Sequence, residues 1–138
     1  NGIQAMDLTA RKLMDGGDAA FRILEEIQAG AETAKEKHPA LAEAVWQSVE
    51  ALRETTEWLV AQEDLNNRFA GAVPYLRAFA RVLGGHVHLT SAVSGDAARA
   101  RLAAFYINRI LPEHMGLLAH TREGAADLTA ISADDLAA

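Results

Sequence analysis

The sequence predicts an all-α fold, an antiparallel four-helix bundle preceded by one short helix. Apolar residues recur at spacings of three and four along most of the chain, which indicates amphipathic helices, and no strand pattern stands out. Half of the residues are hydrophobic but only 6% are aromatic, so alanine and leucine must do most of the packing. Small aliphatic side chains favour close helix–helix contacts over a β-sandwich.

The first predicted helix covers residues 3–13 and ends at a polar, glycine-rich turn. Gly16 and Gly17 can take the left-handed conformation of a helix end, and Asp18 can cap the helix that follows. We expect a boundary here, with residues 1–17 as one unit and residues 18–138 as the bundle. Because the chain opens on a helix without a methionine, we expect it to be part of a longer protein.

The next two helices are predicted from residue 19 to the His38-Pro39 pair and over residues 40–64, because proline favours a break in a helix. Trp46 and Trp58 broaden the apolar surface of the second one. The inward positions are Ala20, Ile23, Leu24, Ile27, Ala31 and Ala34 in the first, and Leu41, Val45, Ser48, Leu52, Thr55 and Leu59 in the second.

The fourth helix, over residues 67–93, is apolar nearly all round, so we expect it to be buried nearly all round at the centre of the bundle. Leu76 in particular should be buried, and Leu76→Ala should cost roughly 2–5 kcal/mol. One stripe comprises Phe69, Ala72, Val73, Leu76, Ala80, Leu83 and Val87, and a second comprises Tyr75, Phe79, Val82, Leu89 and Val93.

A fifth helix is predicted from Asp96, which can act as its cap, with a kink or break at Pro112 because proline removes a backbone hydrogen bond. Ser132-Ala133-Asp134-Asp135 can start a final turn. The expected inward positions are Leu102, Phe105, Tyr106, Ile107, Ile110 and Leu111, then Met115, Leu117 and Leu118.

Composition excludes several classes of function. The net charge of -6 argues against nucleic acid and against an anionic membrane as partners, because both need a basic face. With no cysteine there is no disulfide and no thiolate nucleophile or metal ligand, which fits the cytoplasm. No apolar run approaches the roughly 20 residues of a membrane span, and we expect a soluble intracellular domain.

No set of residues amounts to an active site, so we expect no catalytic and no metal-binding residue. None of the five histidines follows a glutamate at the spacing that helical di-metal sites use. Nucleotide-binding and serine hydrolase motifs are missing. Gly84-Gly85 inside a helix predicts a close approach of another element more than a ligand contact. Arg77 and Arg81 share one face, where an ion pair with a neighbouring helix or a bound anion would account for them.

Two sets of segments resemble flavin-dependent acyl-CoA dehydrogenases. Residues 1–8 (Asn-Gly-Ile-Gln-Ala-Met-Asp-Leu), with Arg11-Lys12-Leu13, resemble the last helix of the catalytic core. Residues 70–77 (Ala-Gly-Ala-Val-Pro-Tyr-Leu-Arg) and Gly84-Gly85 resemble the extra C-terminal helical domain of one branch, which includes 3-methylmercaptopropionyl-CoA dehydrogenase. Residues 104–106, 110–112 and 124–128 are similar to its closing helix.

The resemblance implies an FAD enzyme that removes two hydrogens from an acyl-CoA thioester, with its glutamate base just before residue 1. Asn1 and Gly2 then occupy positions near the flavin, where Gly2 offers only backbone, and the chain alone should hold no FAD. The expected partners are the rest of the enzyme and further copies of it, with the bundle as a structural or interface domain. Two alternatives stay open: a free-standing module for protein–protein interaction, and peripheral membrane association, against which the negative charge weighs.

Overall fold

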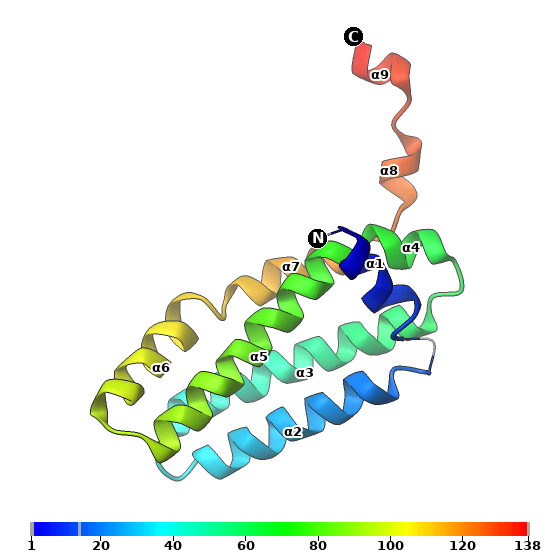
Figure 1. Ribbon diagram of the computed structural model, residues 1–138. Helices are drawn as coiled ribbons and strands as arrows, with labels where there is room; N and C mark the ends of the chain where they lie inside the picture. Colours follow the sequence, from blue (N-terminus) through cyan, green and yellow to red (C-terminus); the bar gives the residue numbers. More distant parts are fainter. Residues whose placement is uncertain (1, 14, 138) are drawn as a thin grey trace.

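The computed structural model describes residues 2–13 and 15–137, which fold into helices joined by short turns (Figure 1). No strand occurs in this part of the chain, and the predicted all-α class is confirmed. The helices are α1 (Gly2–Ala10), α2 (Asp18–Ala34), α3 (Pro39–Ala61), α4 (Leu65–Ala70), α5 (Ala72–Ser94), α6 (Ala97–Arg109), α7 (Glu113–Arg122), α8 (Ala126–Ala130) and α9 (Ala133–Ala137).

The bundle consists of four rows of helix packed around one core. Helices α2, α3 and α5 fill three of them, and α6 and α7 follow one another along the fourth (Figure 1). Consecutive long helices run in opposite directions, so the bundle is antiparallel as predicted. Helix α5 packs against α1, α2, α3, α4, α6 and α7, which confirms its central place.

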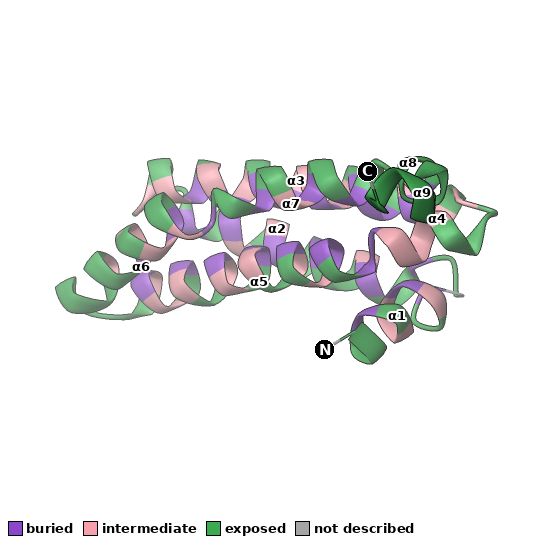
Figure 2. Cartoon of the chain, turned by 90° about the horizontal axis from the view of Figure 1, so that it is seen from above, coloured by how far each residue is buried: buried purple, intermediate pink, exposed green. Residues whose placement is uncertain are grey.

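Burial falls on one side of each long helix (Figure 2). Tyr75 of α5 is fully buried, and its hydroxyl oxygen lies 2.9 Å from Oγ1 of Thr56 on α3. The Thr56 hydroxyl donates to the carbonyl of Leu52 at 2.7 Å, which leaves the Tyr75 hydroxyl to donate to Thr56. The largest fully buried side chains are Tyr75, Leu13, Leu24, Ile27, Leu52, Leu59, Leu89, Ile107, Leu111, Leu118, Val45 and Val49.

The expectation that α5 is buried nearly all round is wrong. Its second stripe faces the core, but Val73, Leu83 and Val87 of the first stripe are exposed and Leu76 is only partly buried. Helix α5 has α1, α2, α3, α6 and α7 as neighbours, and these leave Val73, Leu83 and Val87 exposed. The apolar residues on all sides of α5 therefore predicted more burial than the helix has in the structure.

Several helix boundaries differ from the prediction: α1 ends at Ala10 and α2 at Ala34, both earlier than expected, and two further differences lie around Gly71 and Asp64. The expected helix over residues 67–93 is interrupted at Gly71, where a Cβ would lie 2.6 Å from the carbonyl oxygen of Thr121. The third helix ends at Ala61, because Asp64 accepts a hydrogen bond from the Asn66 amide at 2.8 Å and begins α4 instead.

The turn before α2 uses a different acid from the one expected. Gly16 and Gly17 have φ of 73° and 83°, as their left-handed role requires. Asp18 is the first residue of α2, and the carboxylate of Asp15 accepts from the amides of Gly17 and Ala19 at 2.9 and 3.4 Å. The capping role predicted for Asp18 is therefore wrong, since Asp15 supplies the acceptor.

In the C-terminal third of the chain, the helix cap and the helix breaks lie where the sequence predicts them. Asp96 caps α6 by accepting from the amides of Ala98 and Arg99 at 3.0 and 3.1 Å. The chain breaks around Pro112, and a turn does begin near Ser132, as α9. The inward placement of Leu102, Phe105 and Met115 is wrong, because these side chains are 50%, 60% and 63% exposed.

Candidate functional site

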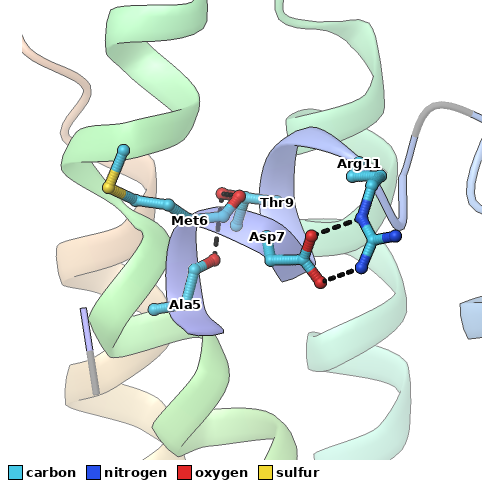
Figure 3. Close-up of polar contacts among 5 residues, drawn as sticks. All are labelled: Ala5, Met6, Asp7, Thr9 and Arg11. Atoms are coloured by element: carbon cyan, nitrogen blue, oxygen red, sulfur yellow. Dashed lines mark hydrogen bonds and ion pairs between the residues drawn. The ribbon is translucent and has the colours of Figure 1, made fainter. Parts of the chain in front are cut away.

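Helix α1 is joined to the bundle through one face. Ala5 and Thr9 are buried, as is Leu13 in the turn that follows, and α1 packs against α4 and α5. The Thr9 hydroxyl donates to the carbonyl of Ala5 at 3.2 Å, so its polar group is satisfied within the helix (Figure 3). Ile3 and Met6 of the same helix are 80% and 46% exposed.

The solvent side of α1 carries an ion pair. The guanidinium of Arg11 donates to the carboxylate of Asp7 through two nitrogens, at 2.5 and 2.9 Å (Figure 3). These hydrogen bonds lower the pKa of Asp7 and raise that of Arg11. Both side chains are engaged with each other in an exposed position, so they serve the helix locally.

Only one of the two residues expected near the flavin, Gly2, lies in the described part of the chain. Asn1 lies outside the described residues. Gly2 is exposed, and no atom of another element comes within 4 Å of where its Cβ would be.

An apolar row runs along the outer face of α5, and we call it the α5 seam (Val73, Leu76, Ala80, Leu83 and Val87). Val73, Leu83 and Val87 are 48%, 40% and 58% exposed, Ala80 is exposed, and Leu76 is partly buried. The spacing of three and four was visible in the sequence. What sequence reasoning missed is the side of the helix on which the bundle lies.

Gly84 and Gly85 of α5 have a packing role, as predicted, but another side chain lies very close to the backbone at Gly84 alone. A Cβ on Gly84 would lie 2.6 Å from Cζ of Tyr106 and would overlap its hydroxyl. That hydroxyl donates to the carbonyl of Arg81 at 3.2 Å, and the ring stacks on His88 at 4.6 Å. A Cβ on Gly85 would meet only ordinary contacts, at 3.4 Å and beyond.

The two arginines of α5 have different surroundings. Nε of Arg81 donates to Glu113 of α7 at 2.7 Å, which raises the pKa of Arg81. The expected ion pair with a neighbouring helix is therefore confirmed for this residue. Arg77 is exposed, and no ion pair joins it to another described residue.

The histidines are dispersed over the bundle. Among residues 2–13 and 15–137, no three histidine, aspartate or glutamate side chains lie close enough together to hold a metal ion. His86 packs against Gly30 of α2, where its buried Nδ1 has no hydrogen-bond partner and desolvation lowers its pKa. His38 lies 3.3 Å from the carbonyl of Ala92, and His114 lies 2.6 Å from that of Leu111.

Hollows on the surface are small. One apolar groove of about 330 Å³ runs between α3 and the break from α6 to α7, and Ala51, Ile107 and Met115 are among its lining residues. A second, also about 330 Å³, lies between α2 and α5 beside Gly30 and His86. Both are at the lower end of the size of small-molecule sites.

Comparison with known families identifies the bundle. Residues 23–132 match the family model described as acetyl-CoA dehydrogenase C-terminal like. The chain belongs to this family. No curated protein and no solved structure matches it significantly.

The match places the acetyl-CoA dehydrogenase C-terminal-like domain on the structure. It begins within α2, takes in α3 to α8 and ends before α9, so it covers the four-helix bundle and leaves α1 outside. The membership supports the resemblance to acyl-CoA dehydrogenases at the level of the family. In the described part of this domain, no helix is long and apolar enough to cross a membrane.

Proposed function

We propose that this chain is the C-terminal region of an FAD-dependent acyl-CoA dehydrogenase of the branch that includes 3-methylmercaptopropionyl-CoA dehydrogenase. The full-length enzyme would remove hydrogens from the α and β carbons of an acyl-CoA thioester. The family match over residues 23–132 is the observation that carries the proposal. The resemblance of residues 1–13 to the end of a catalytic core supports it independently.

The role of the chain within that enzyme is structural. Residues 1–17 would be the last helix of the catalytic core and residues 18–138 the appended bundle. Ala5, Thr9 and Leu13 are buried where α1 meets the bundle. A helix that belongs to the core while its inner face packs on α4 and α5 would fix the bundle rigidly against the core.

FAD would be held by the catalytic core, and only the start of α1 would approach it. Asn1 and Gly2 are the residues of this chain closest to that place in the family pattern. Bound FAD would accept the hydride from the substrate. The general base would lie upstream of residue 1. Gly2 is exposed in this chain, so a catalytic core could approach this end of α1.

Flavin reduction tests the proposal. The full-length protein that contains this chain should be yellow, and an acyl-CoA substrate should bleach its flavin absorbance without added electron acceptor. The isolated 138-residue chain should bind no FAD. A full-length protein that binds no flavin, or an isolated chain that binds FAD stoichiometrically, would contradict it.

The exposed apolar surface favours a second candidate, a module that binds a partner protein on its own. Val73, Leu83 and Val87 are the observation behind it, since contiguous exposed apolar surface often marks an interaction site. The two candidates differ in whether a catalytic core is encoded in the same reading frame. A Tyr-Glu-Gly-Thr motif directly before Asn1 would support the dehydrogenase.

A further inference from the structure

His86 of α5 packs on α2 at a place where α2 has no side chain. A Cβ on Gly30 would lie 2.6 Å from Cε1 and 2.8 Å from Nδ1 of the His86 ring, so only glycine fits beneath the ring. Nδ1 is buried, and none of the described residues gives it a hydrogen-bond partner. Buried polar atoms in folded proteins are nearly always hydrogen-bonded, so this orphaned nitrogen weakens the contact between the two helices.

The orphaned nitrogen makes the contact sensitive to the charge of the ring. A neutral imidazole can carry its proton on Nε2, and it then packs on Gly30 at the cost of one unmade hydrogen bond. A protonated imidazole carries a proton on both nitrogens. Its Nδ1–H would be a buried, charged donor without an acceptor, which is less favourable than the neutral ring. Desolvation accordingly lowers the pKa of His86.

Glu26 is the charged group that acts on His86 from α2. It lies four residues before Gly30, and residues four apart share one face of a helix. Desolvation is the larger cause and lowers the pKa of His86, whereas the charge of Glu26 raises it. Glu26 is exposed, so a protonated ring that leaves Gly30 has a negative charge within one helical turn.

Among the described residues, the other helices packed on this stretch of α5 bring side chains that are uncharged or already paired. His88 lies two residues beyond His86, so its ring points about 200° away around the helix. Glu26 is therefore the partner that this part of the chain offers to a charged His86. The side chains from the other helices are Val45 of α3, Tyr106 of α6, which stacks on His88, and Glu113 of α7, which is paired with Arg81.

The far end of the same interface is held by the turn between α2 and α3. Nζ of Lys37 donates to the carbonyl of Val93 at 3.1 Å, and Nε2 of His38 lies 3.3 Å from the carbonyl oxygen of Ala92. These carbonyls end α5, where positive charge is favourable. The hollow of about 330 Å³ lies between this end and His86. A movement of the His86 ring would therefore open one wall of the hollow while the end of the interface stays closed.

We propose that protonation of His86 releases its ring from Gly30, turns it toward Glu26 and admits water to the hollow between α2 and α5. The contact with Gly30 belongs to the neutral ring, and the contact with the Glu26 carboxylate belongs to the charged ring. The closed state is complete above about pH 6.5, the ordinary pKa of histidine, and is lost as the pH falls from there through the lowered pKa of His86. The switch uses neither flavin nor acyl-CoA, so it stands or falls separately from the proposed function.

An NMR titration of the unmodified chain follows the switch directly. Hε1 of His86 and Hα of Gly30 are in contact in the closed state, so they should give a strong nuclear Overhauser effect (NOE) at about pH 7.5. The NOE should disappear on acidification in step with protonation of the His86 ring, which its Cε1 chemical shift reports in the same spectra. A ring that takes up its proton while the NOE persists, or that stays neutral until the chain unfolds in acid, would overturn the proposal.

Glu26→Gln tests the second position of the ring. The variant removes the negative charge that favours the protonated His86, so the loss of the NOE should move to lower pH. Glu25→Gln is the matched control, because Glu25 is also exposed on α2 and its charge is no cause of the shift at His86. Its titration should follow that of the parent. Identical titrations of the Glu26→Gln variant and the parent would contradict the role of Glu26.

Gly30→Ala imitates the open state at neutral pH. Its Cβ would overlap the closed position of the His86 ring, whereas a Cβ on Gly116 would have no atom within 4 Å. Circular dichroism checks that Gly30→Ala is folded, and its His86 signals at about pH 7.5 should then resemble those of the parent in acid. Gly116→Ala should keep the signals of the parent. A folded Gly30→Ala variant whose His86 titrates as in the parent would contradict the proposal, and the titration of the parent decides it if the variant does not fold.

Discussion

The phenol ring of Tyr106 on α6 rests against the backbone of Gly84 on α5. The contact is held by the hydrogen bond from the Tyr106 hydroxyl to the carbonyl of Arg81 and by stacking on His88. Glycine in a helix interior costs about 1 kcal/mol relative to alanine. Here the missing side chain makes room for an aromatic ring that joins two helices.

Substituting the two adjacent glycines should therefore have opposite effects. Gly84→Ala pushes Tyr106 out of its place and should lower the free energy of unfolding by about 1–3 kcal/mol, in the range of overpacked sites. Gly85→Ala meets only ordinary contacts and should be neutral or stabilise by up to about 1 kcal/mol. Urea melts measure both, and equal effects would show that Tyr106 does not depend on Gly84.

Burial of Tyr75 makes stability depend on alkaline pH. Desolvation raises the pKa of Tyr75 to about 12, against 10.0 for an ordinary tyrosine. The unfolded chain releases this proton from about pH 10, while the folded chain keeps it until about pH 12. Stability is therefore complete below pH 10 and falls as the pH rises from 10 to 12, by about 2–3 kcal/mol.

The matched comparison for that loss is Tyr75→Phe. Tyr106, whose pKa is also raised by burial, is present in both proteins, so the difference between their pH profiles belongs to Tyr75. At neutral pH the variant loses one buried hydrogen bond and should be less stable by roughly 0.5–1.5 kcal/mol. Identical alkaline profiles for the two proteins would mean that the Tyr75 hydroxyl is not desolvated.

Asp96 should contribute to stability as a helix cap. Its carboxylate accepts from two amides at the start of α6, so Asp96→Ala should cost about 1 kcal/mol. Asp96→Asn should retain most of that free energy, because an amide oxygen also accepts hydrogen bonds. Asp18→Ala is the comparison, since no side-chain hydrogen bond caps the start of α2 from Asp18. A larger loss from Asp18→Ala than from Asp96→Ala would refute these assignments.

Truncating a leucine should lower the stability of the protein more on the inner face of α5 than on its outer face. Leu89 is fully buried, so Leu89→Ala should cost about 2–5 kcal/mol, the range of core positions. Leu76 is only partly buried, and in dilute protein Leu76→Ala should cost less than half as much. Thermal or urea melts at low concentration decide between this result and the equal losses that two core leucines would give.

The sequence predicts the local features of α5 and its neighbours better than it predicts how these helices face one another. Periodicity alone located the long helices, and Pro112 and Asp96 located a break and a cap, because these features depend on residues close in the chain. Periodicity could not tell which of the two apolar stripes of α5 faces the core. That depends on where α2, α3, α6 and α7 pack, and for the same reason Leu102 and Phe105 were misplaced.

The candidate site was less predictable than the fold. The pairing of Gly84 with Tyr106, and of Tyr75 with Thr56, depends on the register between helices far apart in the sequence. The interruption at Gly71 depends on the approach of Thr121. The family, by contrast, could be recognised from short runs of consecutive residues, since these need no knowledge of packing.

Single-turnover flavin reduction in the full-length protein tests the central claim, that this bundle supports an acyl-CoA dehydrogenase without taking part in its chemistry. We predict that Leu89→Ala and Gly84→Ala lower the midpoint of thermal unfolding of the full-length enzyme. At a temperature where both variants remain folded, the rate at which a saturating acyl-CoA reduces the flavin should stay within about threefold of the parent. A hundredfold slower reduction in folded, flavin-loaded variants, or a full-length protein whose flavin no acyl-CoA reduces, would contradict the account.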